Sequence, residues 1–143
     1  MKTGTFDTIS IFKDVRVWFN AMGTLPWNIR LWACFYPLPQ IVGGLIFILT
    51  LPGAVILFGR ILSGVIASQI HKRSPFSKLM GPVGHTHWII IVPYLLYELT
   101  TQDLSPTLFW FVSYVIGTTL ISGIIDVMEL RTYLKKGHIA YKR

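Results

Sequence analysis

Five ionisable residues stand within or at the edges of long apolar stretches of this sequence: Arg60, His85, His87, Glu98 and Asp126. Charged groups inside a membrane span are costly, so they often line a path for ions or protons or hold a ligand. His87, Tyr94 and Glu98 are spaced by seven and four residues and share one helical face, whereas His85 points elsewhere. One interpretation is therefore a proton- or ion-conducting polar interior. The other, which we favour, places both histidines and Glu98 at the ends of a span and leaves only Arg60 deep.

Small and polar residues form two stripes that point to a partner for Arg60. The first stripe comprises Gly53, Arg60, Ser63, Gly64, Ala67 and Ser68, and the second comprises Thr119, Ser122, Gly123 and Asp126. Small residues at helical spacing allow two helices to approach closely. We therefore expect the two stripes to meet, with the long side chain of Arg60 reaching Asp126 to form an ion pair inside the bundle.

Cofactor chemistry has weaker support in the sequence. His85 and His87 are the weak candidates for a haem or quinone site, but residues two apart on a helix do not face one another. Metal ligation would need a distorted helix start and ligands from elsewhere, so we predict no metal site. The single cysteine, Cys34, excludes an intrachain disulfide and any CxxC motif. With no catalytic motif either, we predict a protein that is not an enzyme and carries no cofactor.

The surrounding elements belong to a membrane protein. Of the 143 residues, 52% are hydrophobic and only 13% are charged, well below the ~25% charged residues of soluble domains. Between Arg30 and His71 the only charge is Arg60, and that stretch is too long for one helix across a ~30 Å hydrocarbon core. We predict one all-α, polytopic membrane domain over residues 1–143, with four transmembrane helices. The expected spans are about 31–51, 54–70, 79–99 and 107–130, with the first break at Thr50 to Gly53.

The first thirty residues have an amphipathic pattern. Apolar residues recur at helical spacing, and the gaps contain Lys13, Asp14 and Arg16. Residues 1–30 are therefore expected to contain a helix lying in the headgroup region, or alternatively a helix docked on the rest of the protein. The five tryptophans fall near the ends of the predicted spans and are expected to form an interfacial belt: Trp18, Trp27, Trp32, Trp88 and Trp110.

Basic residues indicate the orientation of the chain. With both termini cytoplasmic, every Lys and Arg except Arg60 lies on the inner side, including those of the basic tail at 131–143, and the two outer loops contain none. The net charge of +7 then belongs to one face, which favours contact with anionic lipid headgroups. A nucleic-acid partner is not needed to explain it.

Three stretches carry a family resemblance: LPWNIRLW at 25–32, FSKLMGPVGHTHW at 76–88 and IIDVMELRTYL at 124–134. Together they resemble a group of small uncharacterised proteobacterial inner-membrane proteins with LPWxIRLW, LGxGHxxW and IDVxDVxRYL patterns. His85 and Asp126 match these patterns, Glu129 stands near the second acidic position, and His87 is an addition. The resemblance implies a bacterial inner-membrane protein with four spans, and it implies no activity.

The expected function is binding. Four short spans leave no room for a soluble catalytic domain, and small-residue stripes can pack between chains as well as within one. We therefore expect an accessory subunit of a membrane complex or a self-associating bundle. The alternatives are a small transporter or proton conductor using Arg60, His87, Glu98 and Asp126, and a membrane anchor for haem or quinone.

Overall fold

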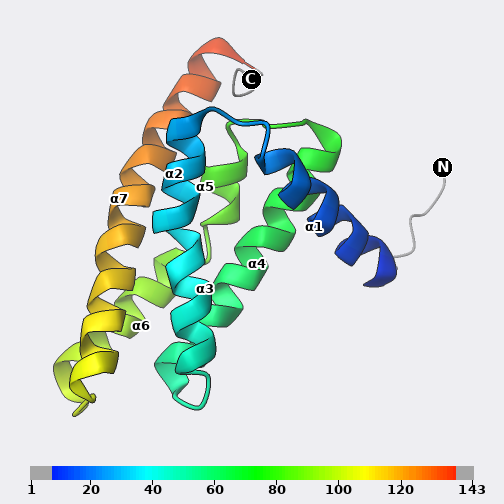
Figure 1. Cartoon of the computed structure of the whole chain (residues 1–143). Helices are drawn as coiled ribbons and strands as arrows, with labels where there is room; N and C mark the ends of the chain where they lie inside the picture. Colours follow the sequence, from blue (N-terminus) through cyan, green and yellow to red (C-terminus); the bar gives the residue numbers. More distant parts are fainter. Residues whose placement is uncertain (1–7, 138–143) are drawn as a thin grey trace.

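The computed structural model describes residues 8–137, and its side chains are described from residue 10. The described chain is all-α (Figure 1). Its helices are α1 (Thr8–Met22), α2 (Trp27–Phe35), α3 (Pro37–Ile46), α4 (Leu51–Arg73), α5 (Met80–Gly84), α6 (Trp88–Thr101) and α7 (Pro106–Lys136). The ends of the predicted N-terminal segment and basic tail, including His138, lie outside the described residues.

Three helical stretches are long and apolar enough to cross a membrane. They are Trp27–Ile46, which joins α2 and α3, then Leu51–Arg73 and Pro106–Lys136. The first begins and ends several residues earlier than the predicted 31–51, and the last two extend beyond the predicted 54–70 and 107–130 at both ends. The last helix continues to Lys136, so the start of the predicted basic tail is helical.

The predicted span over 79–99 is wrong as a single continuous helix. It is divided into the short α5 and the 14-residue α6, with His85, Thr86 and His87 between them. Three of the five residues of α5 are poor helix formers, Gly81, Pro82 and Gly84, which is consistent with a helix that ends after little more than one turn. The turn satisfies part of its own backbone, because Trp88 N donates to His85 O at 3.0 Å. At ~1.5 Å per residue, α6 alone spans only ~21 Å.

The turn between α3 and α4 lies slightly before the predicted break. The chain reverses over residues 47–50, and Pro52 and Gly53 already belong to the first turn of α4. Thr50 caps this helix, since its Oγ1 accepts from Gly53 N at 3.2 Å. Glycine is required at position 53, because a Cβ there would collide with the carbonyl group of Phe47.

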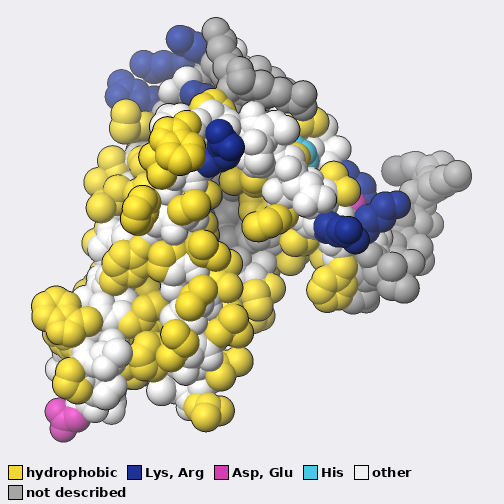
Figure 2. Space-filling model, in the orientation of Figure 1, with side chains coloured by type: hydrophobic (Ala, Val, Ile, Leu, Met, Phe, Trp, Pro, Cys, Tyr) yellow, Lys and Arg dark blue, Asp and Glu magenta, His cyan; other side chains and the backbone are white. Residues whose placement is uncertain are grey.

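The long helices α4, α6 and α7 alternate in direction along the chain, so α4 and α7 run parallel to each other (Figure 1). An apolar core lies between them. Residues from α4, α6 and α7 form this core: Ile56, Trp88, Val92, Leu95, Leu108, Val112, Val115 and Ile116. Many large apolar side chains remain exposed, such as Leu49 at 98% and Ile90 at 77%, and Lys and Arg side chains gather at one end and on α1 (Figure 2). We call this the basic end. A protein with such an apolar exterior and three spanning-length helices is suited to a bilayer.

Candidate functional site

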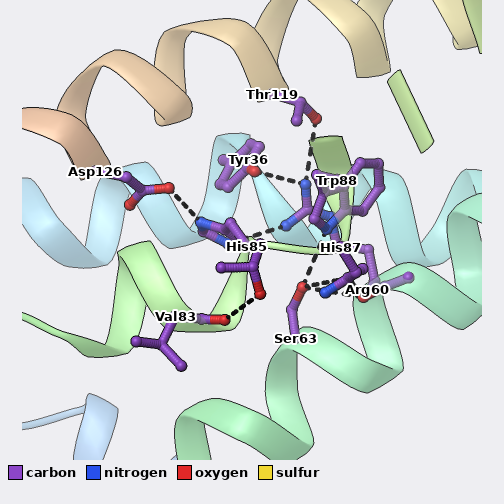
Figure 3. Close-up of polar contacts among 11 residues, drawn as sticks. Tyr36, Arg60, Ser63, Val83, His85, His87, Trp88, Thr119 and Asp126 are labelled. Atoms are coloured by element: carbon purple, nitrogen blue, oxygen red, sulfur yellow. Dashed lines mark hydrogen bonds and ion pairs between the residues drawn. The ribbon is translucent and has the colours of Figure 1, made fainter. Parts of the chain in front are cut away.

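Arg60 is the centre of the site, and it lies near the middle of α4 with 4% of its surface exposed. Its Nε donates to Gln40 Oε1 at 2.5 Å, and its Nη2 donates to Tyr36 Oη at 2.6 Å and, at 3.3 Å, to Thr119 Oγ1. Tyr36 lies at the α2–α3 junction, Gln40 in α3 and Thr119 in α7, so the side chain of Arg60 connects α4 to three other parts of the chain. Figure 3 shows the bonds to Tyr36 and Thr119. A charge-assisted hydrogen bond contributes more than a neutral one, and several here act on the same cation.

Two aromatic rings cover the faces of the guanidinium. Its Cζ lies 4.1 Å from the ring centroid of Tyr36 and 4.1 Å from that of Trp88. A planar cation between two rings gains cation–π attraction on both sides, and the attraction is strongest where water is excluded. Arg60 is thus enclosed by two aromatic rings and by hydrogen-bond acceptors.

His85 connects Arg60 to Asp126, in place of the direct ion pair predicted from the sequence. Arg60 Nη1 lies 3.5 Å from His85 Nε2, and His85 Nδ1 lies 2.7 Å from Asp126 Oδ2. No salt bridge joins Arg60 and Asp126 themselves among the described residues. Arginine has no acceptor, so Nε2 of His85 must accept from it and Nδ1 must carry the proton donated to the carboxylate. The imidazole of His85 therefore lies between a cation and an anion.

A glycine makes the approach of Asp126 possible. A Cβ at Gly81 of α5 would collide with Asp126 Oδ1 and would lie 3.2 Å from Glu129 Oε2. The carboxylate of α7 therefore packs directly against the backbone of α5, next to His85 at the end of that helix. A larger residue at position 81 would displace the Asp126 carboxylate from this position.

His87 belongs to a second polar group, next to the first. Its Nε2 lies 2.9 Å from the carbonyl oxygen of Gly59 and 3.3 Å from Ser63 Oγ, while Trp88 Nε1 donates to the same Oγ at 3.1 Å. Since a carbonyl only accepts, Nε2 of His87 is the donor. The Nδ1 atom is buried and has no hydrogen-bond partner among the described residues.

Tyr94 and Glu98 do not join these groups. They lie further along α6, toward the end opposite the basic end, and Glu98 is eleven residues, or ~16 Å of helical rise, from His87. The Tyr94 hydroxyl is buried without a well-formed hydrogen bond among the described residues, and Glu98 one turn later acts on it electrostatically. Tyr94 and Glu98 therefore lie away from Arg60 and do not extend the polar interior around it.

Some residues of the site escaped the sequence analysis. Tyr36 and Gln40 were not candidates, although a buried glutamine with 0% exposure is as unusual in an apolar helix as a charge. Trp88 was expected in an interfacial belt, which is wrong: it is 3% exposed and lies over Arg60. The signal for it was its position directly after the polar GHTH stretch. No group of three or more His, Cys, Asp and Glu suited to a metal occurs within residues 8–137.

Comparison with known proteins gives no relative: the chain matches no family model, no curated protein and no solved structure. The fold and the site together define a small helical protein with three helices able to cross a membrane and a buried polar cluster at their centre. We call this set the Arg60 cluster: Tyr36, Gln40, Arg60, His85, Trp88, Thr119 and Asp126.

Proposed function

We propose that this protein is a non-enzymatic, four-span protein of a bacterial inner membrane, with both termini cytoplasmic, that acts by binding other membrane subunits or further copies of itself. In this proposal α5 and α6 together form one pass, the third of four in chain order. The Arg60 cluster then has a structural role: it fixes how the helices are arranged, and the outer faces of the helices do the binding. No nucleic acid and no cofactor is involved.

The closure of the Arg60 cluster is the observation that carries this proposal. A residue that handles a transported ion must exchange partners with it, but Arg60 is enclosed by two rings and held by side chains from the neighbouring helices. Arginine also remains protonated under all ordinary conditions, so the chain of hydrogen bonds from Asp126 through His85 ends at a group that cannot pass a proton on. The conducting alternative is therefore disfavoured.

The haem or quinone alternative has less support than binding. Nδ1 of His85 is engaged by Asp126, and Nε2 of His87 is engaged by Gly59 and Ser63, so ligation of a haem iron through these atoms would break existing hydrogen bonds. The imidazole rings of His85 and His87 also belong to different polar groups, the first with Arg60 and Asp126 and the second with Gly59 and Ser63.

A gap on the exposed face of α7 supports association between helices. Gly117 is exposed and has nothing within 4 Å of where a Cβ would stand, and the exposed Trp110 and Ile121 lie about one turn or two away on the same face. Small residues flanked by large apolar ones let another helix approach closely in a bilayer. A membrane helix of a partner fits such a surface.

The test is native-mass measurement of the full chain, extracted directly into lipid nanodiscs. We expect an assembly larger than one chain, and Gly117→Leu should disrupt it without lowering the melting temperature. Gly123→Leu is the matched control, because a Cβ at Gly123 also meets nothing within 4 Å, but this half-buried glycine lies about 120° around the helix. A single chain in every preparation would contradict the proposal, as would proton flux in proteoliposomes that Asp126→Asn abolishes.

A further inference from the structure

The contact between α1 and α4 leaves a groove beside it that faces away from the core. Asp14 of α1 accepts hydrogen bonds from Lys72 Nζ at 2.8 Å and from Gln69 Nε2 at 3.2 Å, and the Trp18 ring packs toward Gly64. These residues of α1 share one side of the helix, which packs against α4. On its other side Phe12 is 75% exposed and Phe19 71% exposed, which places two aromatic rings next to the basic end.

The groove itself has a volume of about 260 Å³ and follows the second half of α4. Val65, Ile66, Gln69, Ile70 and Arg73 line it. All five residues belong to α4, and α1 contacts one of them, because Gln69 also bonds to Asp14. From Val65 to Arg73 the helix rises ~12 Å, which is most of the ~15 Å thickness of one leaflet of the hydrocarbon core.

Arg73 gives this groove a charged end. Its neighbour Lys72 is already paired with Asp14, whereas Arg73 makes no ion pair or side-chain hydrogen bond that the described residues show. Arg73 is the last residue of α4 and is exposed at the basic end. A guanidinium in this position offers two parallel donors, which match phosphate oxygens.

We propose that the groove holds an anionic phospholipid, with one acyl chain along Val65, Ile66 and Ile70 and its phosphate against Arg73. A mostly apolar, open groove along α4 that ends at the exposed cation of Arg73 matches the acyl chain and the charged phosphate of such a lipid. The exposed rings of Phe12 and Phe19 insert next to it and hold α1 in the interface. The net positive charge of the basic end selects an anionic over a zwitterionic headgroup.

The experiment measures binding of dioleoylphosphatidylglycerol and dioleoylphosphatidylcholine to the purified full chain in detergent by native mass spectrometry. We expect phosphatidylglycerol to bind more tightly, and Arg73→Gln to weaken it about tenfold. Arg131→Gln is the matched control, because Arg131 is an exposed arginine at the same end, on α7. Ile66→Ser should weaken phosphatidylglycerol binding while leaving Arg73 in place.

Three results would overturn the proposal. Equal losses from Arg73→Gln and Arg131→Gln would show a diffuse basic surface and no groove. Equal affinity for the two lipids would remove the role of charge. Displacement of the lipid by inorganic phosphate at similar concentration, unaffected by Ile66→Ser, would show a phosphate site without an acyl chain. Melting temperatures of all variants establish that each one is folded.

Discussion

Two cations on the same helix, Arg60 and Lys72, are held in opposite ways. Lys72 has a carboxylate partner, Asp14, at 2.8 Å, but more than half of its side chain is exposed. Among the described residues Arg60 has no ion pair with a carboxylate, yet it is 4% exposed and has neutral partners on several helices. Solvent screens the exposed interaction of Lys72 much more than the buried interactions of Arg60. Burial, more than the presence of an opposite charge, decides how strongly each cation holds the structure.

The largest expected effect is the loss of the Arg60 side chain. Arg60→Met should lower the free energy of unfolding by ~3 to 5 kcal/mol, because it leaves Asp126 without its balancing charge and removes the donor to Gln40 Oε1 and Tyr36 Oη. Thermal unfolding in detergent measures this. Lys72→Met, on the same helix, is the control and should change the melting temperature only slightly. Similar losses from both would contradict the comparison.

A substitution that keeps the charge tests whether charge or hydrogen-bond geometry is needed at position 60. Arg60→Lys retains a cation but loses the planar fork that reaches Gln40 and Tyr36 together, so it should recover only part of the lost stability. Full recovery would mean that charge alone, and no particular hydrogen-bond geometry, is required at this position.

The next effect concerns the link through His85. Arg60→Met and Asp126→Asn should be non-additive, with a coupling energy of ~1 to 3 kcal/mol, because His85 joins the two residues. In a His85→Leu background the same two substitutions should become additive. The measurement is a set of double-mutant cycles from thermal unfolding. Coupling that persists without His85 would favour the direct ion pair that the sequence alone suggested.

The smallest effect concerns the exposed pair and pH. The hydrogen bond from Lys72 holds the pKa of Asp14 below its ordinary value. A carboxylate with a lowered pKa in the folded state stabilises the fold above its unfolded pKa of ~3.9, and this contribution is lost as pH falls through the folded value. Docking of α1 should therefore loosen only below about pH 4.

A spin label on α1 measures this loosening. With Cys34→Ala and Val17→Cys, label mobility should rise as the solution is acidified, and Asp14→Asn should be mobile at every pH. Mobility that rises with pH in the intact pair would contradict the assigned cause.

Hydropathy and turn signals in the sequence determined most of the secondary structure. The long apolar runs predicted four spans, and three of them are helices of spanning length, because a chain in an apolar environment must satisfy its backbone within helices. The fourth, over 79–99, is divided into α5 and α6. Helical spacing also placed Arg60 and Thr119 on faces that meet, and the 3.3 Å hydrogen bond between them joins α4 to α7. The spacing of residues in the sequence is enough to predict these faces, because the pattern of small and polar residues repeats with the period of the α-helix.

Only the tertiary structure decided what Arg60 touches. Tyr36 and Gln40 both contact it, and they lie on either side of Pro37, where α3 begins after the end of α2. The direction in which the chain continues after this interruption depends on packing between helices. His85 reaches both Arg60 and Asp126 because the predicted helix over 79–99 breaks, and the break places a side chain where a regular helix would not. A sequence pattern fixes the face on which a residue lies, but hydrogen-bond partners depend on sub-ångström positions that arise only when all helices pack together.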